Sequence, residues 1–361
     1  MRGPVRRIGR MRWFVIVPGA LVPASLAPDV LAAATAPRLA RRLARAARGE
    51  ETAGDENTHL PHLDWLWRAF GGPGRTPVTA PYAWRALNRD SATNAAAESQ
   101  LWFCEPAHLA FARDHLLVAS LADAPLDPGE SQALAAAADE LMQGSGASLR
   151  LLDHAHWFLQ VETPWQIETV PLSAALGRSA YEVLPTGPDA PRWRKLLNEI
   201  QMCWHAHPVN DAREARGAPT VNALWLHGGG IWHPLPRAPF ATLLSDDPVL
   251  RGWALAAGLA PSALLAADAT PAANGDALSV WDGLQSSAAA GGWDAWLDRV
   301  PTLEAVIESV CDRAFAAGFA SVELVLAGSR SARRLSLGAH DGWRFWRRAA
   351  LADVFREGVT E

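Results

Sequence analysis

Lysine, tyrosine and cysteine are scarce in this chain. Its 361 residues include one lysine, Lys195, and two tyrosines, against 17 tryptophans. The three cysteines, Cys104, Cys203 and Cys311, are odd in number and widely spaced. Their number and spacing exclude a complete disulfide framework and a Cys-x-x-Cys metal site. We therefore expect a reducing compartment, and so a cytoplasmic location.

An excess of positive charge and an uninterrupted apolar run are also missing. The formal net charge is -5, which argues against a nucleic-acid partner. The apolar stretch from 13 to 27 is broken by Pro18 and Pro23 and is too short to cross a bilayer as a helix, so no membrane partner is expected. With 49% hydrophobic and 20% charged residues, the composition is that of a folded globular protein.

The N-terminal region has two interpretations. Arginines, the apolar stretch and Leu31-Ala-Ala-Ala34 imitate the three parts of a secretory signal peptide. The alternative, which we favour, is a buried strand from Trp13 to Val17 that ends in a Pro-Gly turn. A helix expected over 31–47 would then complete the strand, turn, helix opening of an α/β fold.

Apolar spacing along the rest of the chain predicts a mixture of helices and strands. Apolar positions recurring every three to four residues predict helices, whereas short apolar or β-branched runs between turn residues predict strands. Helices are expected at 59–70, 130–142, 193–204, 211–216 and 303–315, and strands at 116–121, 149–152, 157–161, 221–226 and 321–326.

Polar residues are concentrated in one central block. Between positions 205 and 227 the chain carries His205, His207, Asn210, Arg213, Asn222 and His227. Buried polar groups without partners are costly, so this block should line a cleft or a domain junction. Arg213, Asn210 and Asn222 could clamp a carboxylate or phosphate group. Alternatively, Arg213 could bond backbone carbonyls at a structural joint.

Other groups leave two interpretations open in the same way. The histidines at 205, 207, 227 and 233 could bind zinc or could be hydrogen-bonded scaffolding. Gly228–Gly230 could cradle a phosphate, but three prolines follow at once, and a tight turn is the alternative. The Trp and Arg residues at 343–348 could stack on nucleotides or could form a helix face against the core.

The central block resembles a known family. The order His207-Pro208-Val209-Asn210, then Arg213, Gly217, Asn222 and Leu224-Trp225-Leu226, is similar to a block of archaeal-type cofactor-independent phosphoglycerate mutases, which belong to the alkaline phosphatase superfamily. The form Gln201 to Asn210 also resembles bacterial proteins named after regulation of pathogenicity factors protein E. The resemblance implies an α/β fold with an alkaline phosphatase-like core, in which helices flank the sheet. The core would comprise residues 11–121 and 220–361, and an inserted α/β subdomain would comprise residues 122–219. It also aligns Arg113 with an arginine that serves the phosphorylated substrate.

The chain departs from that family where the metals would bind. Enzymes of the superfamily hold two metal ions through residues that include an Asp after the first strand and an Asp-His pair after a late strand. Here these places read Val17-Pro18-Gly19 and Gly328-Ser329. Asp55-x-x-x-His59 has a suitable spacing but lies in an acidic linker, and Asp153-His154 lies in mid-chain.

We therefore predict no catalytic residue, no metal and no other cofactor. The expected function is that of a non-catalytic, regulatory or ligand-binding relative of the mutases, with a small anionic ligand or a protein as its partner. The candidate ligand-binding residues are His207, Asn210, Arg213, Asn222 and Arg113. The alternative function is that of an active phosphoglycerate mutase or related metal-dependent phosphotransferase.

Overall fold

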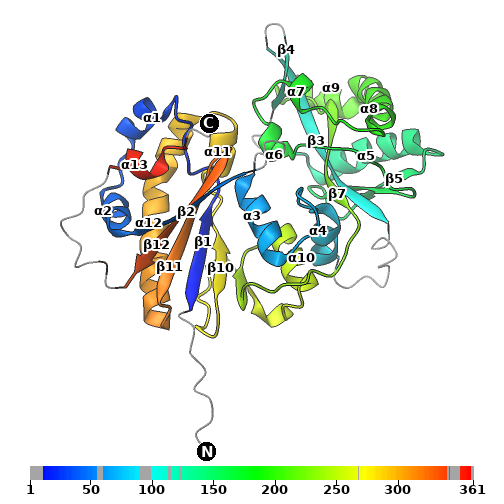
Figure 1. Ribbon diagram of the computed structural model, residues 1–361. Coiled ribbons are helices and arrows are strands. Elements are labelled where there is room, and N and C mark those ends of the chain that lie inside the picture. The colour runs from blue at the N-terminus through cyan, green and yellow to red at the C-terminus, as the bar shows by residue number, and fades with distance from the viewer. Residues whose placement is uncertain are drawn as a thin grey trace, which may run out of the picture. The chain divides into compact units, whose positions relative to one another are not determined.

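The strand predicted near the N-terminus lies inside a seven-stranded sheet in the computed structural model (Figure 1). Strand β1 (Arg12–Val17) pairs in parallel with β10 (Ala277–Val280) on one side and with β11 (Ser321–Ala327) on the other. Its side chains alternate between two buried faces, as the pleat of a strand requires. The predicted buried strand is therefore confirmed.

The structure describes residues 11–54, 60–88, 99–112, 115–119, 121, 124–266, 268–339, 341 and 350–358.

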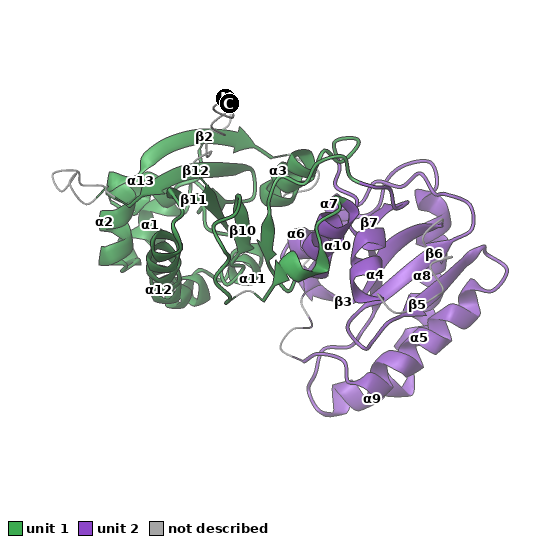
Figure 2. Ribbon diagram, turned by 90° about the horizontal axis from the view of Figure 1, so that it is seen from below, with its two compact units in different colours: residues 1–75, 235–246, 257–361 green, residues 76–234, 247–256 purple. Residues whose placement is uncertain are grey.

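The chain divides into two compact units, which Figure 2 distinguishes by colour. Unit 1 comprises residues 1–75, 235–246 and 257–361, and unit 2 comprises residues 76–234 and 247–256. The inserted subdomain predicted at 122–219 falls within unit 2, and those boundaries remain a prediction.

Unit 1 is built on the mostly parallel sheet. The strand order is β2-β12-β11-β1-β10-β8-β9, and only the β11–β12 and β12–β2 pairs are antiparallel. Apolar residues of α2 and α12 pack against one face, where Trp13 and Val15 point. On the other face Phe14 contacts Trp65 of α3 and Phe240. The further elements are β2 (Ala47–Ala53), β8 (Thr242–Leu244), β9 (Leu264–Leu265), β12 (Ser331–Gly338), α1 (Ala27–Ala33), α2 (Pro37–Arg45), α3 (Pro61–Phe70), α11 (Gln285–Ala289), α12 (Trp293–Ala317), α13 (Ala352–Phe355) and the short 3-10 helix Pro261–Ala263.

Unit 2 is built on an antiparallel sheet. Strand β3 (Gln100–Ala112) is its centre and pairs with β4, β6 and β7, while β5 pairs with β6. Tryptophans of the sheet and of α8 pack with α5 on one face, and α4 packs on the other. The remaining elements are β4 (His115–Ala119), β5 (Ala147–Leu151), β6 (Trp157–Val161), β7 (Ala223–Gly230), α4 (Ala80–Leu87), α5 (Pro128–Met142), α6 (Leu172–Ala175), α7 (Ala180–Val183), α8 (Ala190–His205), α9 (Pro208–Ala215) and α10 (Pro248–Ala256).

The α/β class is confirmed, with a mostly parallel sheet flanked by helices in unit 1. Two local predictions were wrong. The single helix expected at 31–47 is two helices, α1 and α2, because Pro37 forces the residue before it out of the helical conformation. The glycines at 228–230 form neither a phosphate loop nor a turn but the end of β7. A Cβ on Gly229 would lie 2.1 Å from the Trp102 ring, so the strands approach too closely for a side chain there.

Across the described ranges, no helix is both long enough and apolar enough to span a bilayer. The Asp55–His59 pattern and the Trp and Arg group at 343–348 lie outside the described residues.

Candidate functional site

The carboxyl ends of parallel strands are where ligands usually bind in α/β sheets. In unit 1, the end of β1 is closed by neighbouring backbone and an indole ring. The carbonyl of Gly19 accepts a hydrogen bond of 2.8 Å from Nε1 of the buried Trp296. A Cβ on Gly19 would lie 2.7 Å from the carbonyl oxygen of Leu284, and the φ angle of +72° also favours glycine. A metal-binding side chain therefore does not fit at position 19.

The end of β11 carries a carboxylate that already has its partners. Glu357 is 4% exposed, and its Oε1 accepts hydrogen bonds from the backbone N–H groups of Arg330 and Ser331, at 2.6 and 3.0 Å. Its Oε2 accepts a bond of 3.2 Å from the hydroxyl of Ser329. This carboxylate therefore fixes the turn between β11 and β12, at the place where the resemblance implies an Asp-His pair.

The residues present do not fit the two metal ions that the resemblance implies. Asp246 and Asp282 follow β8 and β10 and are the carboxylates closest in sequence to those strand ends. Within the described part of the chain, no group of three or more His, Cys, Asp or Glu residues is arranged to hold a metal ion.

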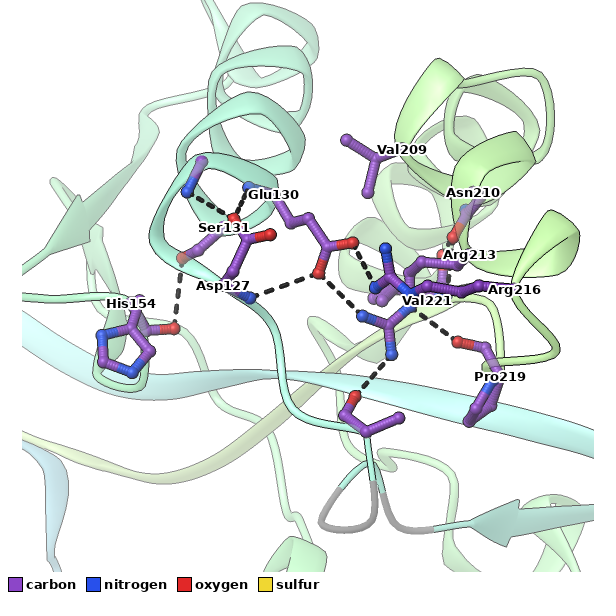
Figure 3. A network of polar contacts seen from close by, with 12 residues as sticks. Asp127, Glu130, Ser131, His154, Val209, Asn210, Arg213, Arg216, Pro219 and Val221 are labelled. Atoms are coloured by element: carbon purple, nitrogen blue, oxygen red, sulfur yellow. Dashed lines mark hydrogen bonds and ion pairs between the residues drawn. The ribbon is translucent and has the colours of Figure 1, made fainter.

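The central polar block lies in unit 2, and its arginine is fully buried. Figure 3 shows the guanidinium of Arg213 in contact with groups from three other segments. Its Nη1 donates to Oε2 of Glu130 at 2.8 Å, its Nη2 to the carbonyl of Ala124 at 2.5 Å, and its Nε to the carbonyl of Pro219 at 2.7 Å. The side chain is 0% exposed. Each nitrogen of the fork thus has a protein partner.

Glu130 connects this arginine to the start of α5. Asp127 and Glu130 form a capping box, in which each side chain bonds the backbone N–H of the other residue. Glu130 also accepts a bond of 2.5 Å from Nη2 of Arg216. Although burial opposes ionisation, the hydrogen bonds from Arg216 and Asp127 and the charge of Arg213 hold the pKa of Glu130 below its ordinary value.

Asn210 and Asn222 are used in backbone bonds as well. The amide of the buried Asn210 donates to the carbonyls of Trp204 and Val221 and accepts from the N–H of Val221. The amide of Asn222 bonds both backbone groups of Leu109 on β3. Asn210 therefore joins α8 and α9 to the segment that leads into β7, whereas Asn222 joins that segment to β3.

His207 and Arg113 complete the predicted set. His207 is the N-cap residue of α9, and its Nδ1 accepts a bond of 3.2 Å from the N–H of Val209. Arg113 lies outside the described residues. The structure thus brings Asn210, Arg213 and His207 together around α9, with contacts typical of a structural joint, and the ligand-binding role of the set remains a prediction.

The sequence reasoning missed a pair formed by the buried His227 and the half-buried Glu105. His227 on β7 places Nε2 3.3 Å from Oε2 of Glu105 on β3, and its ring stacks on Phe103. Burial opposes ionisation of Glu105, but the charge of His227 and the contact with it hold the pKa of Glu105 below its ordinary value. The pair was missed because β3 was not predicted, and only that strand brings position 105 next to position 227.

Comparison with known proteins gives structural similarities only. No protein-family model matches the chain, and no curated protein matches its sequence. Among solved structures, the cofactor-independent phosphoglycerate mutase of Thermoplasma acidophilum is 14% identical, with a TM-score of 0.40, over 92% of this chain and 90% of that one. The PH0037 protein of Pyrococcus horikoshii is 13% identical, with a TM-score of 0.47, over 95% of this chain and 92% of that one.

Proposed function

We propose that this chain is a non-catalytic relative of the cofactor-independent phosphoglycerate mutases and acts as a regulatory or ligand-binding protein. The relationship is proposed from the resemblance of the block from Gln201 to Leu226. The loss of catalysis is proposed from one observation, the closed carboxyl edge of the parallel sheet, where Trp296 bonds Gly19 and where Glu357 bonds the turn after β11.

The chemistry of phosphoryl transfer explains why this observation matters. Two metal ions activate the nucleophile and neutralise the transferring group only if several carboxylates and imidazoles converge within a few ångströms. At this edge the carboxylate of Glu357 already accepts three hydrogen bonds from Ser329, Arg330 and Ser331, and it is closed to solvent, so its present role is to hold the turn.

The test is an activity assay of the purified full-length protein. We expect no interconversion of 2- and 3-phosphoglycerate and no hydrolysis of p-nitrophenyl phosphate with Mn²⁺, Zn²⁺ or Mg²⁺ added. Titration calorimetry with Mn²⁺ should likewise give no saturable binding. Turnover that disappears with a chelator would support the active phosphotransferase instead.

Matched variants separate true turnover from a contaminant. Asp246→Asn and Asp282→Asn each remove a carboxylate that follows a strand of the sheet. Metal-dependent turnover that either variant abolishes would overturn the proposal, because it would belong to this chain. Trace activity that is equal in the wild type and in both variants and that a chelator does not affect would be assigned to a contaminant and would leave the proposal intact.

A further inference from the structure

A concave, arginine-rich surface lies in unit 1, away from the carboxyl edge. A cleft of about 380 Å³ is lined by four arginines of α2 and by two carboxylates, namely Arg38, Arg41, Arg42, Arg45, Glu308 and Asp341. We call it the arginine cleft. It also includes the end of β12, where Gly338 pairs with Ser321, the first residue of β11. The cleft is therefore at the amino ends of the parallel strands, opposite the edge considered above.

The spacing along α2 gathers the four arginines on one side. They stand at positions i, i+3, i+4 and i+7, which lie on one face of a helix, while Leu39 and Leu43 are buried in the core. Like charges at this spacing repel one another, so they destabilise the helix unless negative groups lie beside them.

Helix α2 lies beside α12 (Figure 1), and two glutamates of α12 hold it in place. Oε2 of Glu304 accepts bonds of 2.7 and 2.8 Å from the backbone N–H groups of Arg38 and Leu39. Glu308 forms a two-bond ion pair with Arg42, at 2.6 and 2.5 Å. These contacts hold α2, which carries the guanidinium groups, in place before a ligand binds. Such preorganisation favours binding.

Carboxylates share the cleft with the arginines. The hydrogen bond from Arg42, assisted by the charges of Arg38 and Arg41, holds the pKa of Glu308 below its ordinary value. Several guanidinium groups therefore act on one carboxylate. Asp341 is the second carboxylate, and its Oδ2 accepts a bond of 2.6 Å from the N–H of Gly338. The lining holds four arginines and two carboxylates, and the carboxylates of Glu304 and Asp312 on α12 also lie near α2.

Size and charge together indicate the ligand class. A phosphate monoester carries a charge of about -1.5 to -2 at neutral pH, and guanidinium forks bond its oxygens in pairs. A volume of 380 Å³ lies within the range of small-molecule sites. The net charge of -5 disfavours a nucleic acid as the occupant.

We propose that the arginine cleft binds the phosphoryl group of a small molecule as a dianion. The exposed Arg38 and Arg41 make the main contacts, and Arg42 is held behind them by Glu308. This site does not depend on the proposed loss of catalysis, because it lies at the other end of the strands.

Calorimetric titration of the full-length protein tests the proposal. The probes are inorganic phosphate and glycerol 3-phosphate, each at constant ionic strength with chloride as the background anion. We expect saturable binding that weakens at least about tenfold in the double variant Arg38→Gln/Arg41→Gln, since two charge-assisted contacts are lost. The matched control, Arg194→Gln/Lys195→Gln, removes the same charge from the exposed surface of α8 and should bind like the wild type.

Each outcome has a defined meaning. Equal affinity for both probes indicates that the cleft recognises the phosphoryl group alone, and tighter binding of glycerol 3-phosphate assigns the remaining volume to the organic part. The single variants Arg38→Gln and Arg41→Gln are measured too, so that misfolding of the double variant does not end the test. Absence of saturable binding by the wild type, or unchanged binding by the folded arginine variants, would overturn the proposal.

Discussion

The contacts of Arg213 distinguish a structural joint from a ligand clamp. A clamp must present at least one guanidinium nitrogen to its ligand, whereas all three nitrogens of Arg213 bond Glu130, Ala124 and Pro219 inside unit 2. The side chain is also closed to solvent. An anion could reach it only by displacing Glu130 from a buried ion pair.

Arg213→Ala is expected to lower the free energy of unfolding by roughly 3 kcal/mol or more, because it removes the buried ion-pair partner of the Glu130 carboxylate. Arg216→Ala is the matched control. The Arg216 side chain is 49% exposed, so its loss should cost at most about 1 kcal/mol. Urea unfolding of both variants gives the comparison, and similar small losses in the two would contradict the structural joint.

His62 on α3 should make stability depend on pH. It is 5% exposed, and burial lowers its pKa from 6.5 to about 4. The unfolded chain then binds a proton at a higher pH than the folded chain does. The folded protein is therefore most stable, with respect to this group, above pH 6.5. As the pH falls towards 4, His62 lowers the free energy of unfolding, by about 2 to 3 kcal/mol at pH 4.5.

Urea unfolding at pH 7 and pH 4.5 measures this loss. The variant His62→Gln should show a smaller difference between the two pH values than the wild type. His205→Gln, which removes an exposed histidine, should keep the wild-type difference. Equal differences in all three proteins would mean that His62 is not the group responsible.

Sequence reasoning found the central polar block but not the partners that explain it. The density of polar residues from 205 to 227 predicted a cleft or a domain junction, whereas Asn210 and Arg213 are buried inside unit 2. The partner of Arg213 is Glu130, which stands 83 positions earlier in the chain. Local spacing carries no information about such a contact, because it depends on how α5 packs beside α9.

At the scale of elements, regular periodicity was informative and mixed patterns were not. The hairpin of β5 and β6, helix α8 and strand β11 lie close to their predicted positions. Strand β3 was missed because Glu105, Pro106 and His108 interrupt its apolar run, and proline is unusual within a strand. Its three neighbouring strands satisfy the rest of its backbone, which is a tertiary effect.

Helix α2 should depend on a carboxylate from another helix. Glu304 accepts hydrogen bonds from the N–H groups of Arg38 and Leu39, which have no partner within the first turn. Glu304→Ala should therefore cost about 1 kcal/mol, like the loss of an N-cap. Hydrogen exchange should become faster in the first turn of α2.

Asp298→Ala is the control, since this residue is an exposed carboxylate on the same helix α12. It should leave exchange in α2 unchanged. Unaltered exchange and stability in Glu304→Ala would show that water replaces the carboxylate at no cost.

At the scale of the whole molecule, unit 2 is discontinuous in sequence. Helix α10, from residues 248–256, packs on α4, and Nε1 of Trp253 donates a bond of 2.9 Å to the carbonyl of Val78. A fragment of residues 76–234 therefore lacks a helix that covers α4. We expect this fragment to be soluble and cooperative in thermal melts only when residues 247–256 are joined to it through a flexible linker.

A fragment of residues 122–219, the inserted subdomain predicted from the sequence, is the comparison. It lacks β3, with which β6 pairs, and should not fold alone. Cooperative melting of this shorter fragment would instead support residues 122–219 as an independently folding subdomain.

The position of β1 has a consequence for synthesis of the protein. Its two neighbours, β10 and β11, begin at residues 277 and 321, so each pairing joins segments more than 260 residues apart. At ribosomal rates of about 5 to 20 residues per second, the apolar strand waits on the order of 13 to 50 seconds for its first partner. During that interval we expect the strand to need protection from aggregation, and the parallel sheet of unit 1 can form only after all residues of unit 2 have been synthesised.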